Sequence, residues 1–424
     1  MPAARRLTTI ALASILVAAL AGAANAAPRT RLVSKTAAGV VGDTDSEVSA
    51  LSATGRFVVF QSYATNLPQS SAVVPRIYLV DTATGAIRLV SKTSAGTPAT
   101  AGAYEASISG NGRFIAFLSA AANLPGGDGT TNRIYVHDRL AGTTRLVSKT
   151  SGGVAADGRS GPASISRDGR YVAFASQADN LPLGDGVLYQ VYVHDRTTGT
   201  TRVIARTASD SPDGNTQSPS ISGDGRVVAF ESRSTHLPQG DGSAQMYAYD
   251  RSTRQTHLVS MNAQGLAADG PSFGAVVSAD GRVVTFASQS SNLPGGDGTT
   301  YQVYAYVLAT RKPQLVSKTT AGNVGTGPST ESDVSGKGRF IVYRSQAANL
   351  PSGDGTRVHL YLFDRRTATT RLLSRNSRQQ PGNANSFTPA ISSDGRYTSF
   401  ESYATNFPGG GNSKLQVYVR GLLP

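Results

Sequence analysis

The dipeptide Gly-Arg returns along the chain at nearly constant intervals, and this periodicity limits the folds that are open to it. Successive copies lie 56 or 57 residues apart, with their arginines at Arg56, Arg113, Arg170, Arg226, Arg282, Arg339 and Arg396. A repeat of this length is one supersecondary unit that buries its apolar faces against its neighbours. Seven such units span nearly all of the 424 residues. We therefore expect a single repeat domain over residues 27–424.

Each repeat has the composition of four short β-strands joined by turns. The third copy contains the runs SIS, RYVAFAS, QVYVHD and TTRVIA, which are rich in β-branched and aromatic residues. Between them lie DG, NLPLGDG and TTG, whose residues favour turns. Four strands per repeat are typical of a propeller blade. The sequence therefore predicts an all-β protein, a seven-bladed β-propeller of four-stranded antiparallel blades.

The two ends of the repeat array predict how the ring closes. TRLVSKT at 30–36 matches the fourth strand of a repeat, although no complete repeat precedes it. QVYV at 416–419 matches a third strand. We expect the N-terminal strand to be the outermost strand of the last blade, because this pairing covers an edge that would otherwise be open to other chains.

The repeats resemble a known family. SISRDGRYVAF, SISGDGRVVAF and AISSDGRYTSF are similar to the WD40-like PD40 repeat of TolB-like propellers, and the similarity extends over the whole array. The proline that this family often carries before Asp-Gly is absent, with Arg167, Gly223, Ala279 and Ser393 in its place. The resemblance implies a propeller scaffold, whereas what the scaffold binds has to be argued from its sites.

Residues 1–26 have the features of a secretory signal peptide. The basic start MPAARR precedes an apolar stretch and Ala24-Asn25-Ala26, with cleavage expected before Ala27. The apolar stretch is short of the roughly 20 residues of a membrane span, and we expect no such span. Without cysteine the chain has no disulfide and no thiolate metal ligand. We expect a monomer in the periplasm or outside the cell.

The chain is basic, with a formal net charge of +13. Such a surface attracts anionic partners, and for an exported protein these are envelope polymers or lipid headgroups before nucleic acid. A basic residue also follows the fourth strand in six repeats, whereas Met261 takes its place in another. These residues are Lys35, Lys92, Lys149, Arg206, Lys318 and Arg375. They predict either a solubilising rim or a basic ring for an anionic surface.

Residues that recur in every repeat indicate structural roles. An aromatic residue of the second strand and a tyrosine of the third are expected to form the core between blades, with each tyrosine hydroxyl bonded at the blade edge. The serine that ends the second strand is expected to bond backbone, because seven equivalent serines cannot each belong to a catalytic set. The aspartate of the GDG turn is expected to bond its own backbone. The five histidines are spread over four repeats, which argues against a multi-histidine metal centre, and we expect them at the surface or in turns.

Candidate site residues are found where the repeats differ. The inner strands carry three acids, Glu105, Glu331 and Asp333, where most other copies have small or apolar residues. We predict that they face a ligand in the central channel, with Asp333 solvated there because an unpaired buried carboxylate is costly. The loop DTDSE places acids at alternating positions, namely Asp43, Asp45 and Glu47. This loop is either simply polar or a calcium site, since calcium takes several oxygen ligands. We expect no other cofactor.

Three functional hypotheses follow. The first is a secreted, non-catalytic propeller that presents a loop face to a protein or an anionic envelope polymer, because the sequence has no nucleophile–base set and no cofactor fingerprint. The second is a lyase or hydrolase that acts on an anionic glycan, with channel carboxylates as acid and base. A deep channel lined by acids with raised pKa values would favour this enzyme. The third is a calcium-stabilised binding module, whose melting temperature would fall on chelation.

Overall fold

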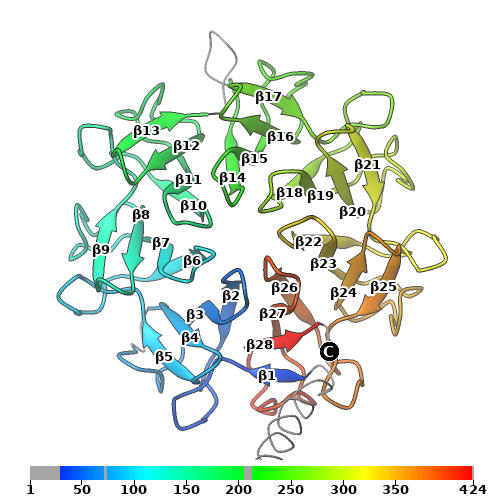
Figure 1. Ribbon diagram of the computed structural model, residues 1–424, viewed down its shortest axis with the longest axis horizontal. Helices are drawn as coiled ribbons and strands as arrows, with labels where there is room; N and C mark the ends of the chain where they lie inside the picture. Colours follow the sequence, from blue (N-terminus) through cyan, green and yellow to red (C-terminus); the bar gives the residue numbers. More distant parts are fainter. Residues whose placement is uncertain (1–28, 71–73, 205–212, 423–424) are drawn as a thin grey trace, which may run out of the picture.

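The computed structural model describes residues 29–70, 74–204 and 213–422, so the predicted signal peptide lies outside the described residues. The described residues form seven four-stranded antiparallel sheets around a central axis, and no helix occurs among them (Figure 1). This is the predicted seven-bladed propeller. Accordingly, the described part of the chain contains no helix that could cross a bilayer.

In each blade the strands follow one another outwards from the channel. The innermost strands are β2 (Ser46–Leu51), β6 (Ala103–Ile108), β10 (Ser160–Ile165), β14 (Thr216–Ile221), β18 (Ser272–Val277), β22 (Ser329–Val334) and β26 (Ser386–Ile391). The second strands are β3 (Phe57–Ser62), β7 (Phe114–Ser119), β11 (Tyr171–Ser176), β15 (Val227–Ser232), β19 (Val283–Ser288), β23 (Phe340–Ser345) and β27 (Tyr397–Ser402). The third strands are β4 (Arg76–Asp81), β8 (Arg133–Asp138), β12 (Gln190–Asp195), β16 (Gln245–Asp250), β20 (Gln302–Val307), β24 (His359–Asp364) and β28 (Gln416–Gly421). The outermost strands are β5 (Ala86–Leu89), β9 (Thr143–Leu146), β13 (Thr200–Val203), β17 (Gln255–Leu258), β21 (Lys312–Leu315), β25 (Thr369–Leu372) and, from the start of the chain, β1 (Thr30–Leu32).

The ring closes as predicted, because β1 is the outermost strand of the seventh blade. It pairs antiparallel with β28, and Leu32 lies opposite Tyr418. A buried arginine on β28 reinforces this pairing. Arg420 donates to the Thr30 hydroxyl at 2.9 Å and to the carbonyl of Arg375 at 2.8 Å. The closing strand thus brings backbone pairing, an apolar contact and a buried cation into one blade.

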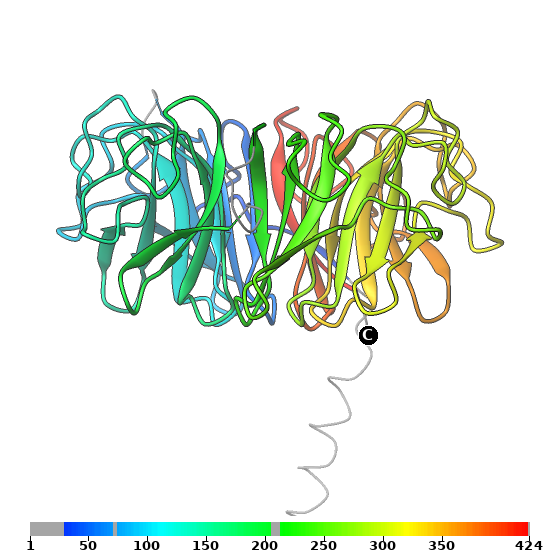
Figure 2. The same cartoon turned by 90° about the horizontal axis from the view of Figure 1, so that it is seen from above.

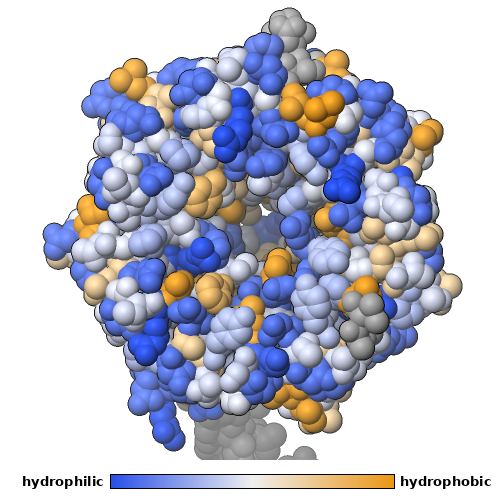
Figure 3. All heavy atoms as spheres, turned by 180° about the vertical axis from the view of Figure 1, so that it is seen from behind, coloured by the Kyte–Doolittle hydropathy of each residue, from blue (hydrophilic) through white to orange (hydrophobic). Residues whose placement is uncertain are grey.

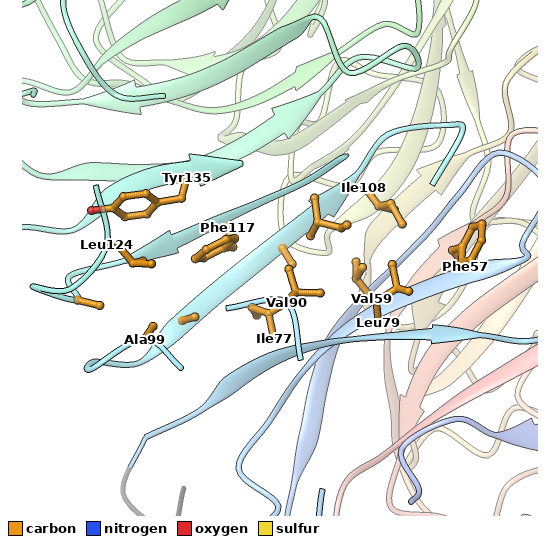
Figure 4. Close-up of a cluster of buried hydrophobic side chains, with 14 residues drawn as sticks. Phe57, Val59, Ile77, Leu79, Val90, Ala99, Ile108, Phe117, Leu124 and Tyr135 are labelled. Atoms are coloured by element: carbon orange, nitrogen blue, oxygen red, sulfur yellow. The ribbon is translucent and has the colours of Figure 1, made fainter. Parts of the chain in front are cut away.

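The hydrophobic core lies between neighbouring blades. Figure 4 shows the part of it between blades 1 and 2, where Val59 and Leu79 of blade 1 lie close to Ile108 of blade 2. The second strands are buried on both faces because each sheet has a neighbour on either side; all six residues of β3 are buried. This packing explains why these strands are continuously apolar instead of alternating.

The recurring aromatic residues stack within each blade. Their ring centroids lie 5.6–5.9 Å apart in all seven blades, as for Phe117 and Tyr135. The predicted core role is confirmed. The hydrogen bonds predicted for the tyrosine hydroxyls are not found. The seven third-strand tyrosine hydroxyls are buried and make no hydrogen bond with described residues.

A second repeated contact joins blades through a ring, a glycine and an arginine. The ring of Phe57 in blade 1 lies under the guanidinium of Arg139 in blade 2, 4.2 Å from its centroid, and Arg139 donates to the carbonyl of Gly112 at 2.6 Å. A Cβ on Gly112 would lie 2.2 Å from this ring, and its φ is +70°. Glycine is therefore required at this position both by the close approach of the ring and by the positive φ. We call this arrangement the ring–arginine contact. It recurs with Phe114 and Arg196 between blades 2 and 3, and with Tyr171 and Arg251 between blades 3 and 4.

The loops and polar side chains mostly behave as predicted. Asp128 accepts the backbone N–H groups of Thr130 and Thr131 at 2.8 and 2.7 Å, as expected for a GDG turn. Ser119 donates to the carbonyl of Gly102 at 2.8 Å, which is a structural role. The expectation of surface histidines is wrong for three of the five, which are buried in third strands: His137, His194 and His359.

Removal of the closing strand should open the ring. A chain that begins at Lys35 loses β1 and with it the burial of Leu32 and Val33, which at about 1.5–3 kcal/mol each amounts to several kcal/mol. It also leaves β28 as a free edge that can pair with other chains. We expect a lower melting temperature and concentration-dependent association, measured by thermal unfolding and size-exclusion chromatography. A chain that begins at Thr30 is the control, and equal melting of the two chains would contradict this account of closure.

Candidate functional site

Every innermost strand is interrupted by a bulge near its start. The register with the second strand shifts after the first one or two residues in all seven blades. The third residue of the strand has a left-handed backbone in six blades, and Pro162 stands there in the seventh. These six residues are Val48, Glu105, Ser218, Gly274, Glu331 and Thr388. Left-handed backbone is rare for valine and threonine, and bulges of this kind re-aim side chains beside functional sites.

The bulges surround one end of the channel. The start of each innermost strand lies opposite the end of the second strand, so the bulges are near the face that carries the loops between second and third strands. Figure 2 shows these longer loops on one face and tight turns on the other. Seen from behind, the loop face has a hollow at its centre (Figure 3). We call this hollow, with the bulge residues and their partners on the second strands, the channel mouth.

All glutamates of the chain lie at the channel mouth. There are five, and each is a bulge residue, the residue before one, or a second-strand residue opposite the start of a bulge. They are Glu47, Glu105, Glu231, Glu331 and Glu401. The other 22 of the 27 acids are aspartates spread over the repeats, so the gathering at the mouth is one of glutamates in a chain with a net charge of +13. Sequence reasoning found Glu47, Glu105 and Glu331 but missed Glu231 and Glu401, which sorting the glutamates by their position in the repeat would have revealed.

Glu401 is the most deeply buried of these acids, with 3% of its surface exposed. Its carboxylate accepts the backbone N–H of Val48, so it joins the last blade to the first. Burial raises the pKa of Glu401 to about 8, and the nearby carboxylates of Glu47 and Glu331 add to this rise. Glu401 therefore holds its proton to a higher pH than an ordinary glutamate does.

The other glutamates have separate surroundings. Glu331 forms an ion pair with Arg344 at 2.8 Å and accepts the N–H of Thr388 in the next blade at 3.2 Å. Glu231 accepts a hydrogen bond from the side chain of Gln217 at 3.1 Å, and burial raises its pKa. Glu105 is open to the channel, yet the surrounding blades displace enough water to raise its pKa. Glu105 and Glu331 are both bulge residues and both exposed, and their contact with a ligand stays a prediction.

Asp333 is half-buried, and its carboxylate is bonded to backbone groups instead of lying free in the channel. Its carboxylate accepts the N–H of Ile391 in blade 7 at 2.8 Å and that of Val334 at 2.7 Å. Burial raises the pKa of Asp333 to about 6, although these bonds oppose the rise. Ser164 and Ser220 occupy the same place in their blades and accept the equivalent N–H of the next blade at 3.1 Å. Asp333 is thus a link between blades and leaves Glu105 and Glu331 as the exposed candidates.

The acids of the DTDSE loop point to different partners. Asp43 accepts the N–H and hydroxyl of Thr65, whereas Asp45 accepts the N–H of Leu415 at 2.8 Å. Glu47 accepts a hydrogen bond from the Gln61 side chain at 2.8 Å. In the described residues no group of three or more acids or histidines is arranged to hold a metal ion. The polar-loop alternative accounts for these contacts, and calcium binding stays a prediction that chelation can test.

Aromatic side chains accompany the acids at the ring closure. Tyr63 and Tyr403 directly follow the second strands of blades 1 and 7, and each is 40% exposed. The side-chain amide of Gln61 lies between Glu47 and the Tyr63 hydroxyl, and Phe387 packs edge-on against Tyr403 at 6.3 Å. Exposed rings beside carboxylates suit a partner that carries cationic or hydroxyl groups.

The basic residues after the fourth strands are not a fully exposed ring. The five described members are half-buried, and Arg206 lies outside the described residues. Binding of an anionic envelope polymer by this rim stays a prediction.

Comparisons with known proteins agree on the fold. No family model and no curated protein matches the sequence. The β-propeller domain of the Trilobed protease from Pyrococcus furiosus is 12% identical, with a TM-score of 0.56 over 89% of this chain and 95% of that chain. An oligogalacturonate lyase in complex with manganese is 14% identical, with a TM-score of 0.53 over 94% and 90%. TolB from Acinetobacter baumannii is 16% identical, with a TM-score of 0.44 over 83% and 68%. The propeller fold that the repeat resemblance implied is confirmed, and likeness at these identities extends to the fold alone.

The raised pKa of Glu401 should make stability depend on pH. An ordinary glutamate loses its proton near pH 4.5, whereas folded Glu401 holds it to about pH 8, so its contribution to stability falls as the pH rises between these values. The variant Glu401→Gln stays neutral and still accepts the Val48 N–H. We expect the melting temperature of the wild type to fall relative to this variant between pH 5 and pH 8, at roughly 2–4 °C for each kcal/mol. Exposed Asp179→Asn is the control, and parallel pH profiles for wild type and Glu401→Gln would contradict the assignment.

Proposed function

We propose that this protein is an exported, non-catalytic binding propeller whose channel mouth takes a basic segment of a partner protein. The observation that carries the proposal is the gathering of all five glutamates at this mouth, with Glu105 and Glu331 exposed there, in a chain with a net charge of +13. A cleft lined by one sign of charge attracts and orients the opposite sign. Export is inferred from the features of residues 1–26.

Contacts at the mouth support binding over chemistry. Glu401 is buried and bonds Val48, Asp333 bonds backbone, and Glu331 pairs with Arg344. Three of the acids therefore have structural partners. Glu105 is open to the channel and supplies a charge without an ion pair among the described residues. Exposed Tyr63 adds the apolar contact that binding surfaces commonly use.

An enzyme that acts on an anionic glycan is a second candidate, and the raised pKa values of Glu47, Glu105, Glu231 and Glu401 favour it. Pairs of carboxyls with different pKa values are typical of acid–base catalysis. The fold neighbour named as an oligogalacturonate lyase suggests the substrate class to test. This candidate can be tested by incubating the protein with polygalacturonate, with and without manganese, and assaying for new chain ends. If no products form, the enzyme candidate is excluded for this substrate and the binding role is retained.

Binding of a basic peptide tests the proposed function. We expect a fluorescein-labelled lysine-rich peptide to bind the mature protein with an affinity that falls as salt rises, as charge attraction requires. The variant Glu105→Gln/Glu331→Gln should weaken binding by about tenfold or more, since it removes two of the charges at the mouth. Fluorescence anisotropy measures both effects.

The matched control is Asp128→Asn/Asp297→Asn, which removes the same charge from two GDG turns outside the mouth and keeps side chains that bond the turn. Equal weakening by the two double variants would reduce the effect to net charge and contradict a site at the mouth. An acidic peptide of the same length that binds equally well would also contradict it.

A further inference from the structure

One of the seven interfaces between blades lacks both parts of the ring–arginine contact. Six of them keep the ring, the arginine or both parts of the ring–arginine contact. Between blades 5 and 6, Val283 stands in place of the aromatic residue, but the arginine is kept. This arginine, Arg365, donates to the carbonyl of Gly338 and to the side chain of Gln314 in blade 5. Between blades 4 and 5 both parts are missing, because Val227 replaces the ring and Leu308 replaces the arginine. This interface therefore lacks both of the large side chains that together fill the interfaces between blades 1 and 2, 2 and 3, and 3 and 4.

The loss leaves a cleft between blades 4 and 5. Its volume is about 480 Å³, against about 80 Å³ at the corresponding place on blade 6, where Phe340 is present. The walls include apolar side chains from both blades, among them Val227, Leu258 and Leu308. Tyr306 closes one side, and its hydroxyl lies 3.1 Å from the sulfur of Met261. Met261 is the residue that replaces the basic side chain found after the fourth strand of other repeats. The volume lies within the range of small-molecule sites.

The cleft is also lined by a Gly-Arg arginine that lacks the usual partner. In blades 1, 2, 3 and 6 the arginine of Gly-Arg pairs with the aspartate that ends the third strand, at 2.7–2.9 Å. In blade 5 that aspartate is replaced by Val307, and Arg282 forms no ion pair with any described residue. In blade 4 the Arg226–Asp250 pair is stretched to 3.8 Å. Arg282, Arg226 and Arg311 all line the cleft.

We propose that the cleft between blades 4 and 5 binds a small organic anion with an apolar or aromatic body. The body occupies the space that the ring and the arginine fill at other interfaces, against Val227 and Leu308. The anionic group pairs with Arg282, because a guanidinium without a carboxylate partner offers charge-assisted hydrogen bonds. The cleft lies between blades, away from the channel mouth, so this proposal is independent of the proposed function.

The experiment uses two fluorescent probes with the same body. 8-Anilinonaphthalene-1-sulfonate carries an anionic group, whereas N-phenyl-1-naphthylamine lacks it. We expect the folded mature protein to bind the sulfonate at one saturable site, well below its melting temperature. Arg282→Gln should weaken binding of the sulfonate by about tenfold and binding of the neutral probe by less than about twofold.

Arg396→Gln is the matched control, because Arg396 belongs to the same Gly-Arg repeat and also faces no third-strand aspartate, Gly421 standing in that place. It does not line the cleft. We expect it to leave both affinities unchanged. Equal weakening by Arg396→Gln and Arg282→Gln would overturn the proposal, as would the absence of saturable binding of the sulfonate.

A second variant restores the repeat. Val227→Phe/Leu308→Arg rebuilds the ring and the arginine, closes the cleft and should abolish binding of both probes. Unchanged affinity in a repaired protein that melts at or above the wild-type temperature would overturn the proposal. If the repaired chain does not fold, the comparison of Arg282→Gln with Arg396→Gln decides.

Discussion

Pairing of β1 with β28 is the constraint on which the rest of the structure depends. Each blade packs against two neighbours, so a ring that opens at one interface exposes two apolar faces. The seventh blade takes its outer strand from the start of the chain, and Arg420 bonds Thr30 across this pairing. Inside the ring, Glu401 bonds Val48 between the same two blades. The closure is thus fixed at the outer edge and at the channel, and the geometry of the mouth follows from it.

Seven equivalent blades provide an internal comparison that separates structure from function. Where a residue recurs with the same contact, as in the serine and aspartate links to the next blade, its role is structural. Two sets of residues escape this equivalence. The glutamates gather at the channel mouth although no repeat position requires them, and the interface at Val227 and Leu308 has lost its filling side chains. By charge complementarity, the glutamates of the mouth suit a basic partner, and the arginine-lined cleft at Val227 and Leu308 suits a small anion.

The fold could be predicted from the sequence because its signals are local and repeated. Strand runs, turn residues and the incomplete repeats at either end were enough to give blade number and closure. The site was less accessible, because its contacts cross blades. Asp333 was expected in solvent since its partner, the N–H of Ile391, is 58 residues away in the next blade. Glu401 was overlooked because it belongs to a strand that reads as core, and its neighbours are known only once the ring is closed. The prediction for the tyrosine hydroxyls was wrong for the opposite reason. A buried hydroxyl usually has a hydrogen-bond partner, but the packing between blades provides none here.

The bulge residues have a consequence for how such a protein can change. They stand one to a blade at a common height around the mouth, and they include valine, glutamate, proline, serine, glycine and threonine. The backbone at these places is maintained by the ladders on either side, so the side chain is not tied to the packing of the blade. A substitution there alters about one seventh of the mouth and little else. Single mutations at these seven positions can therefore change what the mouth binds, while the residues that pack the blades stay the same.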